Sequence, residues 1–305
     1  MMLKIAILSG PLMFFGTIML TEPFTMPPKR REQIIFGFGV GLVFAAHYNY
    51  GFLYGTPELA LLVGNLFAYT VSMKWRLMLT LKEKKLLSKD TYEFSFAADT
   101  PFDFSPGQYL EWTMLESKGS LPTDLRGNRR YFTIASSPTE KEVKLGVKFY
   151  VPSSTFKDSL LKMKEGSIIA AGQRGGDFVM PEDTEKKLVF IAGGIGVTPF
   201  RSMTKYLLDR GEKRDITLIY SVKEEVEIAY RDIFDEAEKK IGLKTLYMVG
   251  NFLTEDIVRE QIPHYNDGHC FYLSGPNAMV ENYKKLFLRM GVKRADIKTD
   301  YFPGF

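Results

Sequence analysis

The chain is poor in the residues that bind metals and form disulfides. It has one cysteine, Cys270, and three histidines among 305 residues. A single cysteine excludes an intramolecular disulfide and any four-cysteine iron–sulfur or zinc site within this chain. His47 is the one histidine in the apolar runs described below, so these runs do not supply both axial ligands of a bis-histidine haem. We therefore expect no metal site, and any electron carrier must be an organic cofactor or a partner.

The sequence also has no large excess of positive or negative charge. The formal net charge is +4, and the 36 acidic residues are spread among the 40 basic ones. A nucleic-acid surface needs clustered Lys and Arg, so we predict no nucleic-acid partner. The length is sufficient for two domains and a further element.

Long apolar runs are present only in the first 73 residues. They extend from Ile5 to Leu20, from Ile34 to about Phe52 and from Leu59 to Met73. With its flanks, each run approaches the roughly 20 residues that a membrane helix needs. Residues 1–73 are therefore predicted to form a membrane domain of about three transmembrane helices in contact with lipid. A signal peptide is the alternative for the first run, although no small-x-small cleavage site follows it.

The basic residues beside these runs predict an orientation. Lys29, Arg30 and Arg31 lie between the first two runs, and Lys74 and Arg76 follow the third. Positive residues favour the cytoplasmic side of a membrane. We therefore expect a multi-pass protein, in the plasma membrane of a prokaryote, with the C-terminal region in the cytoplasm.

Residues 74–183 are predicted to form an antiparallel β-barrel with one short helix. Alternating apolar and polar residues are typical of half-buried strands, and Pro106-Gly107 is a turn signal. We expect strands near 77–81, 92–96, 109–112, 130–135 and 144–150, and a helix over 155–163.

Residues 184–305 follow a different pattern, in which short apolar strands alternate with helical stretches. Strands are expected at 188–192, 216–220, 244–249 and 270–273, and helices at 199–209, 229–240, 254–261 and 276–290. This alternation predicts an α/β domain with a parallel sheet and helices on both faces. A ligand belongs at the carboxyl ends of such strands.

Two motifs in these regions carry the functional prediction: Arg130-Tyr131-Phe132-Thr133, and a glycine turn at 193–199 that leaves an apolar strand. With them, residues 77–305 resemble the ferredoxin-NADP reductase superfamily, in which an FAD-binding barrel precedes an NAD(P)-binding α/β domain. The resemblance implies that Arg130 pairs with the FAD pyrophosphate, Phe132 packs on the flavin ring and Thr133 faces the flavin N5 edge. A guanidinium fork suits phosphate oxygens, and an aromatic face suits a flavin.

The resemblance extends to further cofactor positions. The turn before the helix at 155 would place backbone amides and hydroxyls against the pyrophosphate, although Ser153 or Ser154 is equally well explained as an N-cap. The other FAD contacts that it implies are Tyr131, Phe149, Thr155, Gly175, Gly176, Asp177 and Phe178. Those for NADPH or NADH are Gly193, Gly194, Gly196, Thr198, Pro199, Ser221, Lys223, Gly275, Pro276 and Met279.

Three residues are predicted beside the reacting rings: Thr133, Ser274 and Tyr301. Ser274 stands where relatives carry cysteine, and Tyr301 lies in an aromatic tail that either covers the flavin or packs at the domain interface. The choice between NADH and NADPH stays open, because Lys223 would attract a 2'-phosphate whereas Glu224, Glu225 and the nearby Glu227 would repel it.

The apolar region has a resemblance of its own. Its Phe15-Gly16-Thr17, Thr21-Glu22-Pro23-Phe24-Thr25 and Ile35-Phe36-Gly37-Phe38-Gly39 segments are similar to the last third of the flavin-carrying membrane proteins of the Rnf electron-transport complex and of the sodium-translocating NADH:quinone reductase. Those families carry covalent flavin on a threonine in an earlier segment, which this sequence does not contain, so we do not assign covalent FMN to the chain.

Together these observations predict a membrane-anchored flavoprotein oxidoreductase. It would transfer hydride from NAD(P)H to FAD and pass electrons to a quinone, a redox protein or a ferric complex. The alternative is a non-catalytic membrane scaffold that retains a reductase fold.

Overall fold

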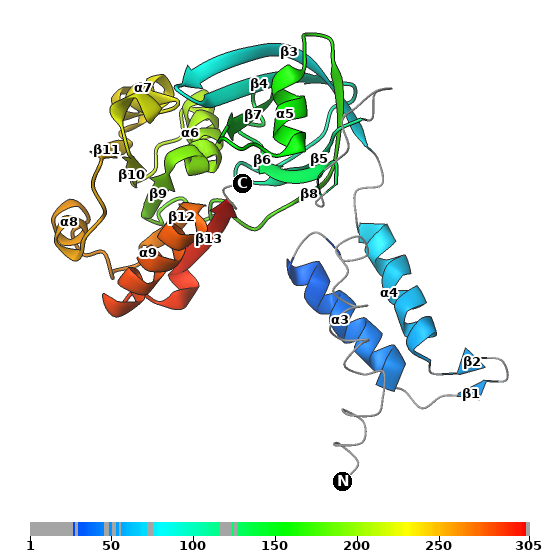
Figure 1. Cartoon of the computed structure of the whole chain (residues 1–305). Coiled ribbons are helices and arrows are strands. Elements are labelled where there is room, and N and C mark those ends of the chain that lie inside the picture. Colours follow the sequence, from blue (N-terminus) through cyan, green and yellow to red (C-terminus); the bar gives the residue numbers. More distant parts are fainter. Residues whose placement is uncertain are drawn as a thin grey trace. The chain divides into compact units, whose positions relative to one another are not determined.

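The computed structural model describes residues 27, 30–45, 49–50, 53–54, 56–71, 76–115, 124 and 127–302. The chain divides into two compact units (Figure 1). The first takes in the chain up to Trp75 together with Gln173–Asp177, and the second comprises Arg76–Gly172 and Phe178–Phe305.

The first unit is built on a pair of helices, α3 (Arg30–Ala45) and α4 (Pro57–Val71). Two short antiparallel strands, β1 (Asn49–Tyr50) and β2 (Leu53–Tyr54), lie between them in the chain. The residues buried between the helices are small on α4 and large on α3. They are Ala60, Gly64 and Ala68 on α4, and Phe36 and Val40 on α3.

The two helices are shorter than the sequence predicted. α3 has 16 residues and α4 has 15, and in the described part of the chain no helix is long and apolar enough to cross a membrane. The run from Ile34 does not continue as one helix to Phe52, because Asn49–Tyr50 pairs with Leu53–Tyr54 in a hairpin. The transmembrane helices predicted at these two runs are therefore not found among the described residues. The first run, Ile5 to Leu20, and His47 lie outside them.

The second unit begins with a six-stranded antiparallel sheet in the order β6-β5-β8-β3-β4-β7. Its elements are β3 (Leu77–Ser88), β4 (Thr91–Ala98), β5 (Tyr109–Thr113), β6 (Arg129–Thr133), β7 (Val143–Lys148), α5 (Thr155–Lys162) and β8 (Ile168–Gly175), although the last three residues of β8 are grouped with the first unit. The edge strands meet beyond the end of β6, where Ala135 N donates to Lys144 O at 2.8 Å. This contact curls the sheet into the expected barrel, and β8 is the strand that the sequence did not predict.

The α/β domain follows in the same unit. Its sheet has five parallel strands in the order β11-β10-β9-β12-β13. The strands are β9 (Leu188–Gly193), β10 (Ile216–Val222), β11 (Lys244–Val249), β12 (Cys270–Pro276) and β13 (Ile297–Phe302). The helices are α6 (Thr198–Arg210), α7 (Arg231–Ile241), α8 (Glu255–Gln261) and α9 (Asn277–Arg289), with short 3-10 turns η2 (Gly194–Val197), η3 (Glu225–Glu227) and η4 (Arg294–Asp296).

Consecutive residues of the central strand β9 point to opposite faces of the sheet, and a layer of helices covers each face. Phe190 packs with the α6 and α7 residues, and Ile191 packs with those of α8 and α9. A parallel sheet covered on both faces is expected to have strands that are apolar throughout, as β9 is. The predicted parallel sheet with helices on both faces is therefore confirmed, with β13 added at the edge.

A polar contact that is largely buried joins the barrel to the α/β domain. Arg201 on α6 is 3% exposed, forms two hydrogen bonds to the carboxylate of Glu140 and donates to Ala135 O at 3.1 Å. Beside it, Ser202 Oγ donates to Ser136 O at 2.6 Å. A side chain at Gly146 would not fit, because a Cβ there would lie 2.7 Å from the Tyr230 hydroxyl. The α/β domain therefore lies directly against the barrel.

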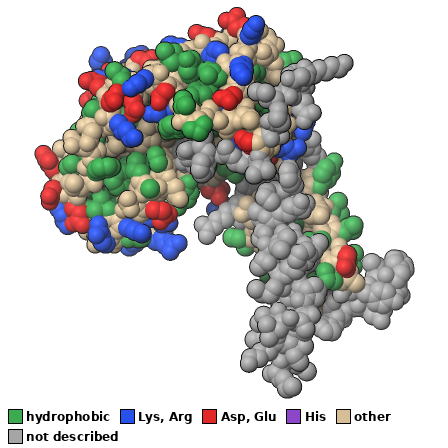
Figure 2. Space-filling view, in the orientation of Figure 1, with side chains coloured by type: hydrophobic (Ala, Val, Ile, Leu, Met, Phe, Trp, Pro, Cys, Tyr) green, Lys and Arg blue, Asp and Glu red, His purple; other side chains and the backbone are tan. Residues whose placement is uncertain are grey.

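The surface of the second unit mixes charges of both signs. On the face in view, Figure 2 shows Lys and Arg side chains interspersed with Asp and Glu. The distribution agrees with the even spread of charge along the sequence.

The turn predicted at Pro106-Gly107 is present, and it requires glycine for two reasons. Gly107 has a φ of +95°, and a Cβ on it would overlap the Phe178 carbonyl oxygen. Gly166 provides a matched comparison, because its φ is +82° but no atom lies within 4 Å of a Cβ built there.

We predict that Gly107→Ala is more destabilising than Gly166→Ala. Both substitutions incur the cost of left-handed backbone, about 1 to 2 kcal/mol, and only Gly107→Ala adds overpacking, of about 1 to 3 kcal/mol. Urea unfolding of the two variants measures the difference. Equal losses of unfolding free energy would show that the approach of Phe178 does not constrain residue 107.

Candidate functional site

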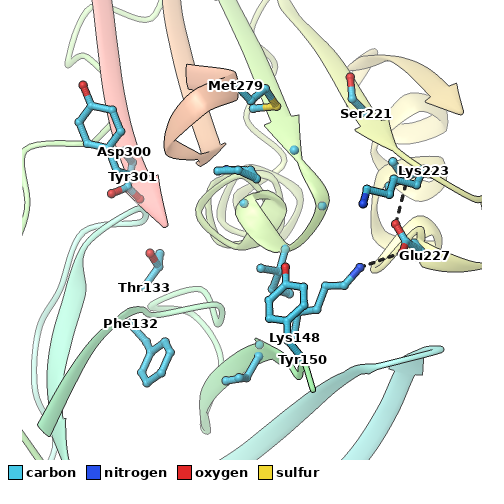
Figure 3. A pocket seen from close by; sticks show the side chains of 18 of the residues that line it. Phe132, Thr133, Lys148, Tyr150, Ser221, Lys223, Glu227, Met279, Asp300 and Tyr301 are labelled. Carbon is cyan, nitrogen blue, oxygen red and sulfur yellow. Dashed lines mark hydrogen bonds and ion pairs between the residues drawn. The ribbon is translucent and has the colours of Figure 1, made fainter. Parts of the chain in front are cut away.

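A cavity of about 890 Å³ lies between the barrel and the α/β domain (Figure 3). Its walls come from β6, β7 and α5 on one side and from the carboxyl ends of β9, β10, β12 and β13 on the other. This volume is within the usual range of ligand pockets, about 300 to 1,000 Å³. The strand ends are where an open α/β sheet places its ligand.

The structure brings many of the predicted site residues to this cavity. Those that line it are Arg130, Tyr131, Phe132, Thr133, Ser154, Gly193, Gly194, Gly196, Ser221, Lys223, Pro276, Met279 and Tyr301. They come from both domains and are separated in sequence by up to 171 positions, from Arg130 to Tyr301. The folded chain therefore brings the two motifs, which are far apart in sequence, to the same cavity.

Other predicted residues of the second unit lie elsewhere. Phe149 packs edge-on against Tyr92, with ring centroids 5.5 Å apart, and Phe178 packs on Phe200 and Tyr272 in the α/β core. The remaining ones that do not line the cavity are Ser153, Thr155, Thr198, Pro199, Ser274 and Gly275. Gly175, Gly176 and Asp177 fall in the first unit, and their cofactor roles stay predictions.

Several lining residues were not predicted from the sequence. They are Tyr109, Arg129, Gly146, Val147, Lys148, Tyr150, Lys157, Ile195, Val222, Glu227, Gly250, Asn251, Phe252, Tyr283 and Asp300. Lys148 and Tyr150 carry a signal in their spacing, because alternate residues at the end of a strand share a face. Asp300 was missed as a site residue because β13 was not recognised as a strand.

One end of the cavity is formed by Arg130, Phe132 and the start of α5. The Arg130 guanidinium makes two bonds to the Asp124 carboxylate, at 2.9 and 3.0 Å. Phe132 packs on Phe156 with ring centroids 5.7 Å apart. Ser154 is the N-cap of α5, accepting a bond from Lys157 N, and it also lines the cavity. The N-cap interpretation of Ser154 is therefore confirmed, and a ligand role at the same residue stays a prediction.

The glycine turn after β9 is packed against the end of β12. A Cβ on Gly193 would lie 2.7 Å from Met279 Cε, and a Cβ on Gly196 would lie 2.6 Å from Gly275 N. These two glycines thus permit close approach of protein to protein, whereas Gly194 supplies the left-handed backbone, with φ of +53°. Pro199 lies in the first turn of α6, as the sequence predicted.

The opposite end of the cavity holds Ser221, Lys223 and Glu227 (Figure 3). Lys148 of the barrel reaches Glu227 at 2.8 Å and Asp90 at 3.5 Å, so this ion pair crosses between the two domains. Burial alone would lower the pKa of Lys148, but the carboxylates raise it above its ordinary value. Likewise burial alone would raise the pKa of Glu227, and Lys148 lowers it. Both groups are therefore charged near neutral pH.

Thr133 and Asp300 meet where β6 faces the end of β13 (Figure 3). Burial raises the pKa of Asp300 to about 7, although hydrogen bonds from the Thr133 hydroxyl and from Tyr301 N act in the opposite direction. Tyr301 beside it donates to Glu281 at 2.7 Å. The carboxyl group of Asp300 can therefore hold or release a proton near neutral pH, inside the cavity.

The donor set fits two phosphate-bearing cofactors with flat rings. Arg130, Lys148, Lys157 and Lys223 offer cations at the cavity wall, and phosphates favour such groups. Ser221 Oγ is buried and, within the described residues, has no hydrogen-bond partner, so a ligand oxygen would satisfy it. The residues present are therefore compatible with FAD on the barrel side and a nicotinamide dinucleotide at the strand ends.

Known proteins resemble this chain in sequence and in fold. Residues 190–285 match the family model of the oxidoreductase NAD-binding domain. A flavohemoprotein of Candida albicans is 26% identical over 213 residues, which cover 64% of this chain and 50% of that protein. The chain thus spans about half the length of the curated relatives that it matches.

Solved structures share the fold. A flavohemoglobin from Malassezia yamatoensis with bound FAD and heme superposes with a TM-score of 0.65 at 20% identity, covering 81% of this chain and 65% of that one. The ferredoxin-NADP+ reductase from Plasmodium falciparum gives a TM-score of 0.64 at 16% identity, with coverages of 76% and 99%. At these identities the likeness shows a shared fold.

The raised pKa of Asp300 leads to a prediction about stability. A carboxyl group with a raised pKa adds stability below its ordinary pKa of 3.8, and this contribution is lost as the pH rises to about 7. We therefore expect Asp300→Asn to gain stability over the unmodified chain between pH 4 and pH 8, by at most roughly 4 kcal/mol. Urea unfolding across this pH range measures it, with the exposed Asp103→Asn as the control. A difference that is independent of pH would contradict the assignment.

Proposed function

We propose that this chain, a ferredoxin-NADP reductase-like oxidoreductase that depends on FAD and NAD(P)H, passes the electrons of NAD(P)H through FAD to an acceptor in or beside a membrane. The observation that carries the proposal is the single cavity that joins the Arg130 strand to the glycine turn after β9. When bound, the two cofactors supply the redox chemistry. The chain supplies binding, orientation and protection from water.

The barrel side of the cavity would hold FAD. Arg130 and the start of α5 offer N–H donors to the diphosphate, since a guanidinium and a helix N-terminus both favour anions. Phe132 is already packed on Phe156 and so presents a fixed aromatic surface to a flat ring. A side chain held by a neighbour loses little freedom when a ligand arrives.

The strand ends of the α/β domain would hold NAD(P)H. The diphosphate would lie at the turn after β9, where η2 leads into α6, and the adenosine would extend toward Ser221 and Lys223. This route follows the general position of ligands at a parallel sheet. Glu227 lines the same end as Lys223, so NADH and NADPH are both candidate donors.

Thr133, Asp300 and Tyr301 would serve the reacting end. Tyr301 and Met279 form apolar wall there and exclude water. Asp300, with its pKa near 7, would hold a proton on its carboxyl group and exchange it through the hydroxyl of Thr133. A proton donor with a pKa near the working pH is effective in proton transfer. The class of the acceptor, whether quinone, redox protein or ferric complex, stays open.

The packing of the first unit supports attachment to a membrane. Small residues of α4 face α3, as in helix pairs that pack in lipid, and large apolar side chains point outward. The outward residues include Ile34, Phe38, Leu42, Leu62 and Leu66, each more than 60% exposed. Exposed apolar patches mark surfaces that bind a membrane or another protein. We infer that this apolar surface contacts lipid acyl chains, which agrees with the membrane prediction from the sequence.

Anaerobic addition of NADH or NADPH to the purified full chain tests the catalytic proposal. We expect a yellow protein whose visible absorbance bleaches on addition of one or both nucleotides. A colourless chain that does not take up FAD would overturn the proposal in favour of a non-catalytic scaffold.

Arg130→Ala should retain at least about tenfold less FAD, since hydrogen bonds to charged groups contribute about 1.5 to 3 kcal/mol. The exposed Arg289→Ala, on the last turn of α9, serves as the control.

Flotation with lipid vesicles tests the membrane proposal separately. The full chain should float with vesicles, and a Leu62→Glu, Leu66→Glu double variant should float much less, because buried charge in lipid is costly. Leu86→Glu is the matched control, since Leu86 is 54% exposed on the barrel strand β3. Equal flotation of the double variant and the unmodified chain would contradict lipid contact at this surface.

A further inference from the structure

Arg130 is engaged on more than one edge. Its Nη1 donates to Gly127 O at 2.9 Å and to Arg129 O at 2.6 Å, and its Nη2 donates to the two carboxylate oxygens of Asp124. A guanidinium carries five N–H donors in a fixed fork. The contacts with Gly127 and Arg129 orient the fork, and the Nη2 edge is occupied by a carboxylate.

Asp124 also contacts the second element of the proposed diphosphate site. Its backbone N donates to Thr155 Oγ1 at 3.1 Å, at the first residue of α5. One residue therefore bridges Arg130 on β6 and the start of α5. These are the two elements that the sequence assigned to the FAD pyrophosphate. The side chains of Arg130 and Asp124 are 15% and 24% exposed, so the pair is largely shielded from water.

A carboxylate and a phosphate make the same demand on a guanidinium. Each is an anion whose oxygens accept from guanidinium N–H groups, and here Nη2 alone donates to both oxygens of Asp124. The Asp124 carboxylate thus offers Nη2 the same charge and the same kind of acceptor atom that the FAD diphosphate would bring to Arg130. Arg130 cannot give its Nη2 edge fully to both anions, so binding of the diphosphate exchanges one oxyanion for another.

We propose that Asp124 is an internal competitor of the FAD diphosphate for Arg130 and sets the affinity of the chain for FAD. The proposal rests on the proposed function, because it requires that Arg130 bind FAD. Its consequence is a flavin that binds less tightly than the donor set alone would permit. Asp124 would then tune retention of the cofactor without touching the reacting rings.

The alternative role of Asp124 is to assist the binding of FAD. A carboxylate that orients the guanidinium, while the diphosphate binds another edge, would assist binding of FAD. Removal of its charge would then weaken affinity. The two roles therefore predict changes of opposite sign in the dissociation constant for FAD.

Quenching of FAD fluorescence by the full chain, after removal of retained flavin, measures this constant. We expect Asp124→Asn to lower it about tenfold, equivalent to about 1.4 kcal/mol. Asp103→Asn is the matched control, because it removes the same charge from an exposed position on the barrel that does not line the cavity. It should leave the constant within about twofold, as expected for a screened surface charge.

A double-mutant cycle links the effect to Arg130. In an Arg130→Gln background, where affinity for FAD is lower, Asp124→Asn should change the constant less than about twofold, because coupling requires both partners. An unchanged or raised constant in Asp124→Asn alone would overturn the competition, as would an undiminished effect in the Arg130→Gln background. Circular dichroism spectra identical to that of the unmodified chain exclude misfolding as the cause. If the unmodified chain and Asp124→Asn both bind no FAD, it is the proposed function that fails.

Discussion

The contact between Arg201 and Glu140 fixes the position of the α/β domain on the barrel, and the rest of the site depends on it. The two walls of the cavity belong to different domains, so their separation is set by how α6 packs on the loop after β6. Burial alone would raise the pKa of Glu140, yet the guanidinium of Arg201 lowers it. The pair is therefore ionised, and a buried pair that lost one partner would be strongly destabilised.

Charge in the cavity is arranged as balanced pairs at its two ends. Arg130 is paired with Asp124 at one end, and Lys148 is paired with Glu227 at the other. Polyanionic cofactors would therefore meet cations that already have partners, and binding energy depends on exchange between anions. Elsewhere in the cavity wall, burial raises the pKa of Asp300 to about 7, so its carboxyl group is only partly ionised near neutral pH.

The two units differ in the size of the side chains that they bury. In the second unit, strand β9 is apolar on both faces, and large residues such as Phe190 and Ile191 fill the core. In the first, Gly64 and its small neighbours are buried, whereas residues such as Phe38 are exposed. Burial of large apolar groups is driven by exclusion from water, and that driving force is absent between helices in lipid. The contrast agrees with the proposal that the first unit contacts lipid.

The sequence by itself determined the barrel, the alternating α/β domain and most of the strand positions, because apolar periodicity and turn residues act locally. It also identified Arg130, Thr133 and the glycine turn, since these motifs are short and continuous. Only the tertiary structure decided that Asp300 faces Thr133 and that Asp124 occupies the edge of Arg130. Partners of this kind come from distant segments, and no local pattern specifies which side chains meet. The lengths of the apolar helices were also decided in three dimensions, because the pairing of Asn49–Tyr50 with Leu53–Tyr54 competes with continuation of the helix.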